Sequence, residues 1–170
     1  QADEASAMVN SIRSGVLGTT ATANTIADGC AVKAPGDKTF AVCKEYLDDV
    51  VSVSEEAIAI AMLALAEKGK VVAEGAGAMP TAAVMSGKVD ASKYKKIVCM
   101  VSGGNVDIGM QQKLFTKALT ATGRMAEIST EVSDKAGNLA KLLDLVSSTG
   151  ANILEINHVR SHMDVSITSC

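Results

Sequence analysis

The sequence predicts an α/β fold, in which helices cover both faces of a parallel sheet, followed by a partial α+β module. The first observation is that short apolar runs alternate with helix-like stretches as far as residue 121. This order favours a parallel sheet with right-handed crossovers. The second is that two of these runs end in glycine-rich segments, at residues 74–78 and 102–105. The third is that the order of apolar runs and helix-like stretches changes after Gly123.

Helix signals and apolar runs give the elements of the first 121 residues. Ser54 is a hydroxyl N-cap, and the carboxylates of Glu55 and Glu56 suit the first turn of the helix that follows. Gly15 and Gly69 are expected to end helices. The predicted elements are, in order, a helix over 4–14, a short helix over 40–46, a strand over 48–53, a helix from 54 to 69, a strand over 70–73, a helix over 79–85, a strand over 97–101 and a helix over 107–120.

After Gly123 the pattern predicts a small module in the order β-α-β-β, beginning near Arg124. Its elements are a strand over 125–132, a helix over 137–149, a strand over 151–159 and a further strand over 163–168. A final helix and strand are expected to be lacking, so we expect the chain to be cut at this end. It also starts at Gln1 with an immediate helix entry, which suggests a start in mid-fold.

The composition narrows the classes of function. Hydrophobic residues make up 48% and aromatic residues 2%, so an aliphatic core is expected. The net charge of −3 provides no basic surface for nucleic acid. No apolar run approaches the roughly 18 residues of a membrane span, and no signal-peptide pattern is present. The four cysteines lack zinc-type spacing and are expected to be reduced thiols of a cytoplasmic protein; they are Cys30, Cys43, Cys99 and Cys170.

Three motifs in order resemble those of the threonine ammonia-lyases (threonine dehydratases). They are Thr-Ile-Ala-Asp-Gly at 25–29, Ala-Glu-Gly-Ala-Gly-Ala at 73–78 and Val-Ser-Gly-Gly-Asn-Val-Asp at 101–107. This family uses pyridoxal phosphate and has the tryptophan-synthase-β fold, known as fold type II, and serine racemase is a close relative. The resemblance covers nearly all of residues 1–121, which we expect to be the C-terminal part of the catalytic domain.

The resemblance implies four cofactor-binding residues. Ser102 matches the serine that hydrogen-bonds the pyridine nitrogen, and Gly103 beside it permits close backbone approach. Glu74 and Gly29 match positions that line the cofactor ring. If this is correct, the Ser102 side chain should be shielded from solvent and close to the place where Glu74 emerges. The alternatives are a serine that only caps the next helix and a glutamate in a surface turn.

The family's other catalytic parts have no match in this chain. No stretch fits the motif of the Schiff-base lysine, and no loop of consecutive glycines is present for the cofactor phosphate. The chain is therefore expected to be a C-terminal fragment that is inactive alone, with the N-terminal half of the enzyme as its partner. Relatives also carry a cation site, which Asp3 and Ala7 match but Val9 does not, so no metal is predicted.

Residues 122–170 resemble an incomplete ACT regulatory domain. Ser133 to Leu139 fits the Asp-x-x-Gly-x-Leu entry, and 152–153 and 157–160 fit the second strand. The resemblance implies a homo-oligomer in which the backbone N–H groups of Gly137, Asn138 and Leu139 bind an amino-acid effector. The implied reaction is β-elimination from threonine, and also from serine, giving 2-oxobutanoate or pyruvate with ammonia, as in isoleucine biosynthesis.

The residues alone leave two other functions open. The chain is alternatively an amino-acid-sensing module without activity of its own. A dinucleotide-binding fold is the third possibility, because the glycine-rich segment from Gly75 follows a strand and opens a helix. Pro80 occupies the third glycine position of that fingerprint. His158 and His162 are expected to be solvated or hydrogen-bonded and not to be metal ligands.

Overall fold

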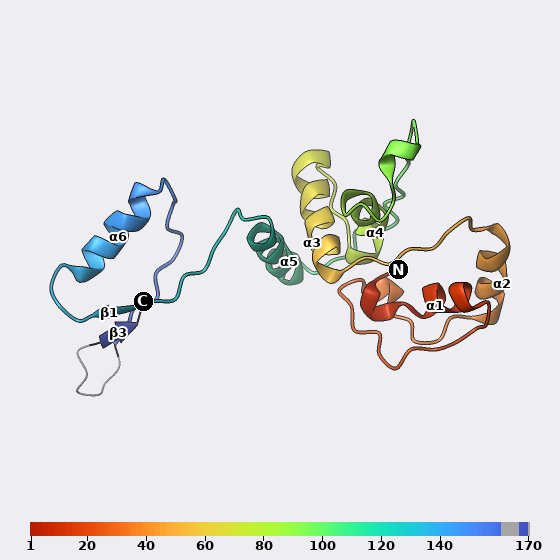
Figure 1. The fold of residues 1–170 in the computed structure, drawn as a ribbon, viewed down its shortest axis with the longest axis horizontal. Helices are drawn as coiled ribbons and strands as arrows, with labels where there is room; N and C mark the ends of the chain where they lie inside the picture. Colours follow the sequence, from red (N-terminus) through yellow and green to blue (C-terminus); the bar gives the residue numbers. More distant parts are fainter. Residues whose placement is uncertain (161–166, 170) are drawn as a thin grey trace. The chain divides into compact units, whose positions relative to one another are not determined.

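The computed structural model describes residues 1–160 and 167–169, the last three and Arg160 by their backbone alone. The chain divides into two compact units, Gln1–Met125 and Ala126–Cys170. Figure 1 shows the elements of both units, and each unit is treated by itself below. No helix in the described residues is long and apolar enough to cross a membrane.

The first unit is built from helices and short helical turns (Figure 1). Every helix that the sequence predicts here is present, although several bounds differ by a few residues. The elements are η1 (Asp3–Ala5), α1 (Ala7–Ser14), η2 (Asp28–Cys30), α2 (Asp37–Tyr46), α3 (Glu55–Ala64), the π-helical turn η3 (Leu65–Gly69), α4 (Gly75–Met85), η4 (Ala91–Lys93) and α5 (Ile108–Ala121).

Local capping explains where these helices begin and end. The Ser54 side chain accepts a hydrogen bond from the Ala57 N–H at 3.1 Å, and Asp107 accepts one from the Met110 N–H at 2.9 Å. Each bond satisfies one of the amide groups that a helix start leaves without a partner. Gly15 ends α1 in the left-handed conformation, with φ of 74°.

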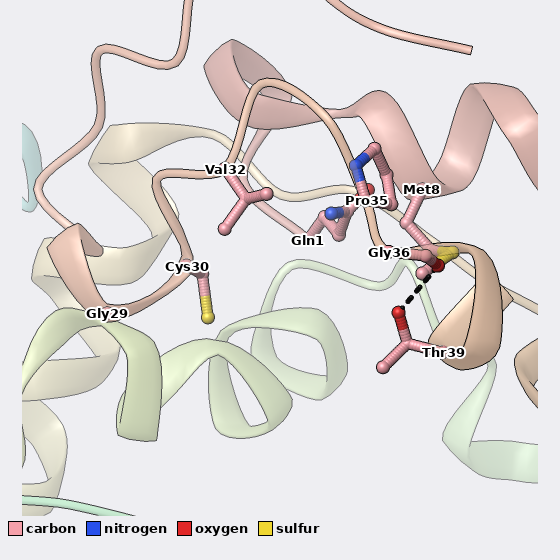
Figure 2. Close-up of a pocket in the computed structure, with 8 residues that line it drawn as sticks. All are labelled: Gln1, Met8, Gly29, Cys30, Val32, Pro35, Gly36 and Thr39. Atoms are coloured by element: carbon pink, nitrogen blue, oxygen red, sulfur yellow. Dashed lines mark hydrogen bonds between the residues drawn. The ribbon is translucent and has the colours of Figure 1, made fainter. Parts of the chain in front are cut away.

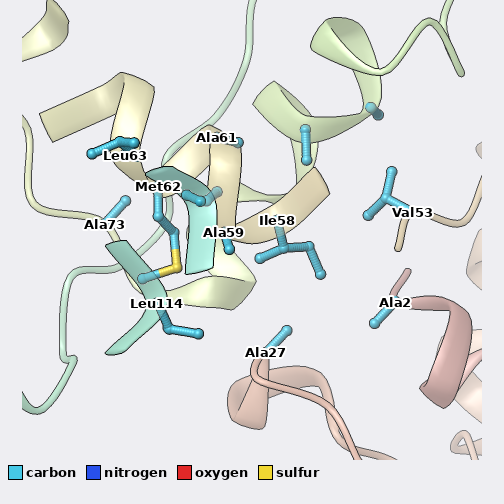
Figure 3. Close-up of a cluster of buried hydrophobic side chains, with 14 of the residues drawn as sticks. Ala2, Ala27, Val53, Ile58, Ala59, Ala61, Met62, Leu63, Ala73 and Leu114 are labelled. Carbon is cyan, nitrogen blue, oxygen red and sulfur yellow. The ribbon is translucent and has the colours of Figure 1, made fainter. Parts of the chain in front are cut away.

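Helix α3 is the centre of the core and packs against α4 and α5. Figure 3 shows its buried side chains together with those of the neighbouring helices. Many of the buried residues are alanines, which allow helices to approach closely. The buried hydrophobic residues of the three helices are Ile58, Ala59, Ala61, Met62, Leu63, Ala78, Ala82, Ala83, Leu114 and Ala118.

The parallel sheet predicted for the first unit is not present in its described residues. The predicted strands at 48–53, 70–73 and 97–101 have no ladder, and the parallel contact that is formed is a single bridge between Ala2 and Val53. A strand exists only where a neighbour accepts and donates its backbone hydrogen bonds. Here Val72 and Val98 are instead 56% and 91% exposed, on chain that has no neighbouring strands.

The second unit contains a three-stranded antiparallel sheet and one helix. Its elements are β1 (Glu131–Ser133), α6 (Asn138–Ser148), β2 (Val159–Arg160) and β3 (Ile167–Ser169), and the strand order is β1-β3-β2. The β-α-β-β order is as expected, but residues 151–158 are not in a strand and β1 is shorter than predicted. The predicted strand over 163–168 lies partly outside the described residues.

Candidate functional site

Two segments far apart in the sequence meet at Glu74, immediately before α4. The Glu74 N–H donates to the Gly103 carbonyl at 3.0 Å. The Glu74 carboxylate accepts a hydrogen bond from the Asn105 N–H through Oε2 at 3.2 Å. Glu74 therefore holds residues 103–105 through both its backbone and its partly buried side chain.

The glycines around this carboxylate leave room for it. A Cβ added to Gly103 would overlap the carboxylate, lying 2.8 Å from the Glu74 Cδ. A Cβ on Gly29 would lie 3.8 Å from Oε1 of the same group and 3.4 Å from the Ala76 Cβ. The structure thus brings together Gly29, Glu74 and Gly103, three of the four residues expected to bind the cofactor. We call these three residues and Ser102 the Glu74 cluster.

The start of α4 packs closely against the same segment. A Cβ on Gly77 would lie 2.6 Å from the Gly103 carbonyl oxygen, and one on Gly104 would lie 2.6 Å from the Val72 carbonyl oxygen. Both of these neighbours are backbone atoms, which cannot turn aside as a side chain can. Glycine is therefore needed at 77 and 104 for this approach.

Ser102 is next to the Glu74 contact, but its side chain is exposed, contrary to the shielded position expected from the sequence. Among the described residues its hydroxyl has no hydrogen-bond partner. An unpaired hydroxyl can donate to or accept from an incoming group. The site therefore offers a hydroxyl that has no partner among the described residues, together with a carboxylate and two glycines. These groups fit a pyridine ring that approaches the end of segment 97–101.

A pocket of about 310 Å³ lies near the cluster and shares Gly29 with it. Figure 2 shows its lining, in which Thr39 Oγ1 donates to the Gly36 carbonyl at 2.8 Å. Burial raises the pKa of the Cys30 thiol in this lining, so the thiol is held in its neutral form. The lining residues are Gln1, Met8, Gly29, Cys30, Val32, Pro35, Gly36 and Thr39.

The remaining cysteines, histidines and carboxylates form no metal site in the part of the chain that the structure describes. Cys30, Cys43 and Cys99 are free thiols there. His162 and Cys170 lie outside the described residues. Pro80, which departs from the dinucleotide fingerprint, lies inside α4.

The residues expected to bind an effector lie at the start of α6. Gly137 has φ of 88°, and the Asn138 side chain donates to Ser133 Oγ at 2.7 Å. The Asn138 N–H donates to the Lys135 carbonyl at 3.2 Å, so this amide already has a partner. The backbone N–H groups of Gly137 and Leu139 have no partner among the described residues.

The sequence did not point to Glu55 as a residue of this region. Its Oε2 accepts a hydrogen bond from the Ile26 N–H at 2.7 Å, and its Oε1 is buried without a partner among the described residues. From the sequence, Glu55 is one of two acids in the first turn of a helix. Nothing local distinguishes it from Glu56, because the Ile26 contact spans 29 positions along the chain.

Comparison with known proteins gives the class to which this chain belongs. Residues 1–103 match the family described as "Pyridoxal-phosphate dependent enzyme". The chain therefore belongs to the family of pyridoxal-phosphate-dependent enzymes. The dinucleotide-binding interpretation gains no support from this match.

Within that family the chain is similar to threonine ammonia-lyases. It is 45% identical over 167 residues to L-threonine ammonia-lyase from Thermotoga maritima, covering 98% of this chain and 41% of the relative. It is 42% identical over 136 residues to L-threonine ammonia-lyase from Geobacter sulfurreducens, covering 80% and 34%. The chain thus spans about two fifths or less of the length of these relatives.

Solved structures with a similar fold include a serine racemase and a threonine deaminase. Maize serine racemase matches with a TM-score of 0.60 and 36% identity, over 66% of this chain and 36% of the racemase. The processed form of threonine deaminase isoform 2 from Solanum lycopersicum matches with a TM-score of 0.59 and 29% identity, over 68% and 32%. About two thirds of this chain therefore has the fold of the corresponding part of these enzymes.

Proposed function

We propose that this chain supplies one wall of the cofactor site in a pyridoxal-phosphate-dependent threonine ammonia-lyase. The observation that supports it best is the 45% identity to such an enzyme over 98% of the chain. The Glu74 cluster lies in the part of the chain that matches the cofactor-dependent family. The substrate would be threonine, and also serine, and the products 2-oxobutanoate or pyruvate with ammonia.

When bound, pyridoxal phosphate supplies an electron sink for loss of the α-proton and the β-hydroxyl of the amino acid. In this proposal the Ser102 hydroxyl holds the pyridine nitrogen as a neutral hydrogen-bond partner. Gly29 and Gly103 allow the ring to approach the backbone. Glu74 lines the ring, and its carboxylate keeps its orientation because the Asn105 N–H donates to it. No catalytic lysine is assigned in this chain.

The test is an assay of the full-length protein that contains this chain. Threonine should give 2-oxobutanoate and ammonia in equal amounts, and the protein should carry the visible absorption of its cofactor. Ser102→Ala should weaken cofactor binding without affecting folding, because the hydroxyl is exposed and has no hydrogen-bond partner among the described residues. Ser129→Ala, which removes another exposed hydroxyl that has no hydrogen-bond partner among the described residues, is the matched control. Absence of both products and cofactor from the folded full-length protein would contradict the proposal.

The second unit supports a second candidate function, the sensing of an amino acid. We propose that residues 122–170 form an ACT-like regulatory module, and that the N–H groups of Gly137 and Leu139, which have no partner among the described residues, receive an effector carboxylate. The antiparallel sheet and α6 support this proposal. Calorimetric titration of the full-length protein with isoleucine and valine is the test, and no heat with either would count against it.

The partners follow from the same proposal. We propose that the N-terminal half of the enzyme pairs with segments 70–73 and 97–101, and the exposure of Val72 and Val98 supports this. We also propose a homo-oligomer in the cytoplasm, and the free thiols at 30, 43 and 99 are in keeping with a reducing compartment. Light scattering of the full-length protein measures the oligomeric state.

A further inference from the structure

Helix α3 carries a carboxylate that holds a distant loop. Glu55 is the first residue of α3, the helix at the centre of the core. Its Oε2 accepts the Ile26 N–H at 2.7 Å, and Ile26 lies in the segment that leads to Gly29. The Ile26 amide is thus hydrogen-bonded to the helix that lies at the centre of the core.

The same loop residue lies against the start of α4. A Cβ on Gly75 would be 2.6 Å from the Ile26 carbonyl oxygen and 3.0 Å from the Ala27 Cα. Ala27 is fully buried. Ile26 is therefore held on its amide side by Glu55 and lies on its carbonyl side against the residue that follows Glu74.

Three residues further on, the loop reaches the Glu74 cluster. A Cβ on Gly29 would lie within van der Waals distance of Ala76 and of the Glu74 carboxylate. A shift of Ile26 would therefore move Gly29 relative to Glu74. The other Glu55 oxygen is buried without a partner among the described residues, which is costly for a carboxylate. The Ile26 N–H is therefore the hydrogen-bond partner that holds this carboxylate among the described residues.

We propose that Glu55 is a positioning residue, which holds the 25–29 loop so that Gly29 and Glu74 face the cofactor together. The proposal rests on the proposed function, because it assigns the cofactor to that cluster. Among the described residues the Glu55 side chain has its hydrogen bond with the Ile26 N–H, and it acts on the cofactor through Ile26 and Gly29. Its neighbour Glu56 is exposed, and among the described residues its side chain has no hydrogen bond to the loop, so it supplies a matched control.

The experiment compares Glu55→Ala, Glu55→Asp, Glu55→Gln and Glu56→Ala in the full-length protein that contains this chain. Glu55→Asp keeps the charge and the helix start but is one methylene too short to reach Ile26. Glu55→Gln keeps an oxygen of the right reach. The first measurement is deuterium exchange of residues 25–29, which needs no cofactor. The second is the visible absorption band of the cofactor, together with kcat and KM.

We expect amide exchange in 25–29 to rise about tenfold in Glu55→Ala and Glu55→Asp, as loss of a hydrogen bond to a charged group implies. The same two variants should show a shifted or weakened cofactor band and a lower kcat with a smaller change in KM. Glu55→Gln should restore both readouts, and Glu56→Ala should leave both unchanged.

Three outcomes would overturn the proposal. They are unchanged exchange in Glu55→Asp, faster exchange without any change in band or kcat, and equal defects in Glu55→Gln or Glu56→Ala. Failure of the proposed function is a separate result. It would appear as absence of cofactor and product in the unsubstituted protein, whereas the exchange measurement would still decide whether Glu55 holds the loop.

Discussion

At the scale of single residues, the effect of replacing a glycine depends on whether its nearest neighbour is a side-chain atom or a backbone atom. The space at Gly103 is limited by the Glu74 carboxylate, the far end of a flexible side chain. The space at Gly77 is limited by the Gly103 carbonyl, which is backbone. Gly103 therefore determines where the Glu74 carboxylate lies. Gly77 determines whether the start of α4 can pack against residues 102 and 103.

Substitutions at these two glycines should separate those roles. Gly103→Ala should displace the Glu74 carboxylate and reduce cofactor retention, with a small loss of stability because the side chain can turn away. Gly77→Ala should lower the free energy of unfolding by about 1–3 kcal/mol, since a backbone atom must move. Urea denaturation and the cofactor absorption of the full-length protein measure the two effects.

Gly18→Ala is the control for both, because its Cβ would meet only the Ser11 hydroxyl at 3.9 Å. Equal losses of stability in Gly77→Ala and Gly103→Ala would show that the distinction between backbone and side-chain neighbours is wrong.

At the scale of elements, the helices followed from the sequence because their signals are local. Ser54 and Asp107 lie one position before the helices that they cap. The strands could not be predicted correctly, because an apolar run such as 97–101 does not reveal whether a neighbouring strand is there to pair with it.

The proximity of Gly29, Glu74 and Gly103 was expected from resemblance to a family. The loop contact of Glu55 is long-range, so no residue near it in the sequence indicated it.

An ion pair joins the turn η3, which follows α3, to the residues that follow α5. The Arg124 guanidinium donates to both carboxylate oxygens of Glu67, each at 2.8 Å. The hydrogen bond from Arg124 lowers the pKa of Glu67 below its ordinary value of 4.5. A carboxyl whose pKa falls on folding stabilises the folded state above its unfolded pKa, and this contribution is lost as the pH falls through the folded pKa.

Arg124→Gln should therefore be less stable than the unsubstituted protein at pH 7, by a small amount because the pair is exposed. The difference should shrink below pH 4.5 and vanish once Glu67 is protonated in both states. Chemical denaturation across a pH series from neutral to acid measures it. Lys93→Gln, which removes a 3.6 Å contact with Asp90, should show a smaller difference. A difference for Arg124→Gln that persists in acid would exclude the ion pair as its cause.

At the scale of the whole molecule, the two units differ in how much they bury. The first unit has a core of fully buried side chains around α3, such as Ile58 and Met62. In the second unit no residue from 126 to 159 is buried, and Leu145 and Leu154 are 65% and 73% exposed. Local stability follows the burial of apolar contacts, so the two units are expected to open independently.

Deuterium exchange of the 170-residue chain should reveal this difference. The amides of α3 should exchange slowest, and those of α6 should exchange at least tenfold faster. The amides of α1, exposed on one side and buried at Val9, should fall between them. Equal protection of α3 and α6 would contradict the expectation that burial sets the order.

The left-handed turn after η3 has a consequence for protein engineering. Lys70 is the one non-glycine residue with positive φ among those described, at 55°. Glycine and asparagine adopt this conformation at lower cost. The lysine compensates in part, because its Nζ donates to the Glu67 carbonyl at 2.7 Å. A randomised library at this codon, selected for heat tolerance, should therefore enrich asparagine and glycine and deplete valine and isoleucine.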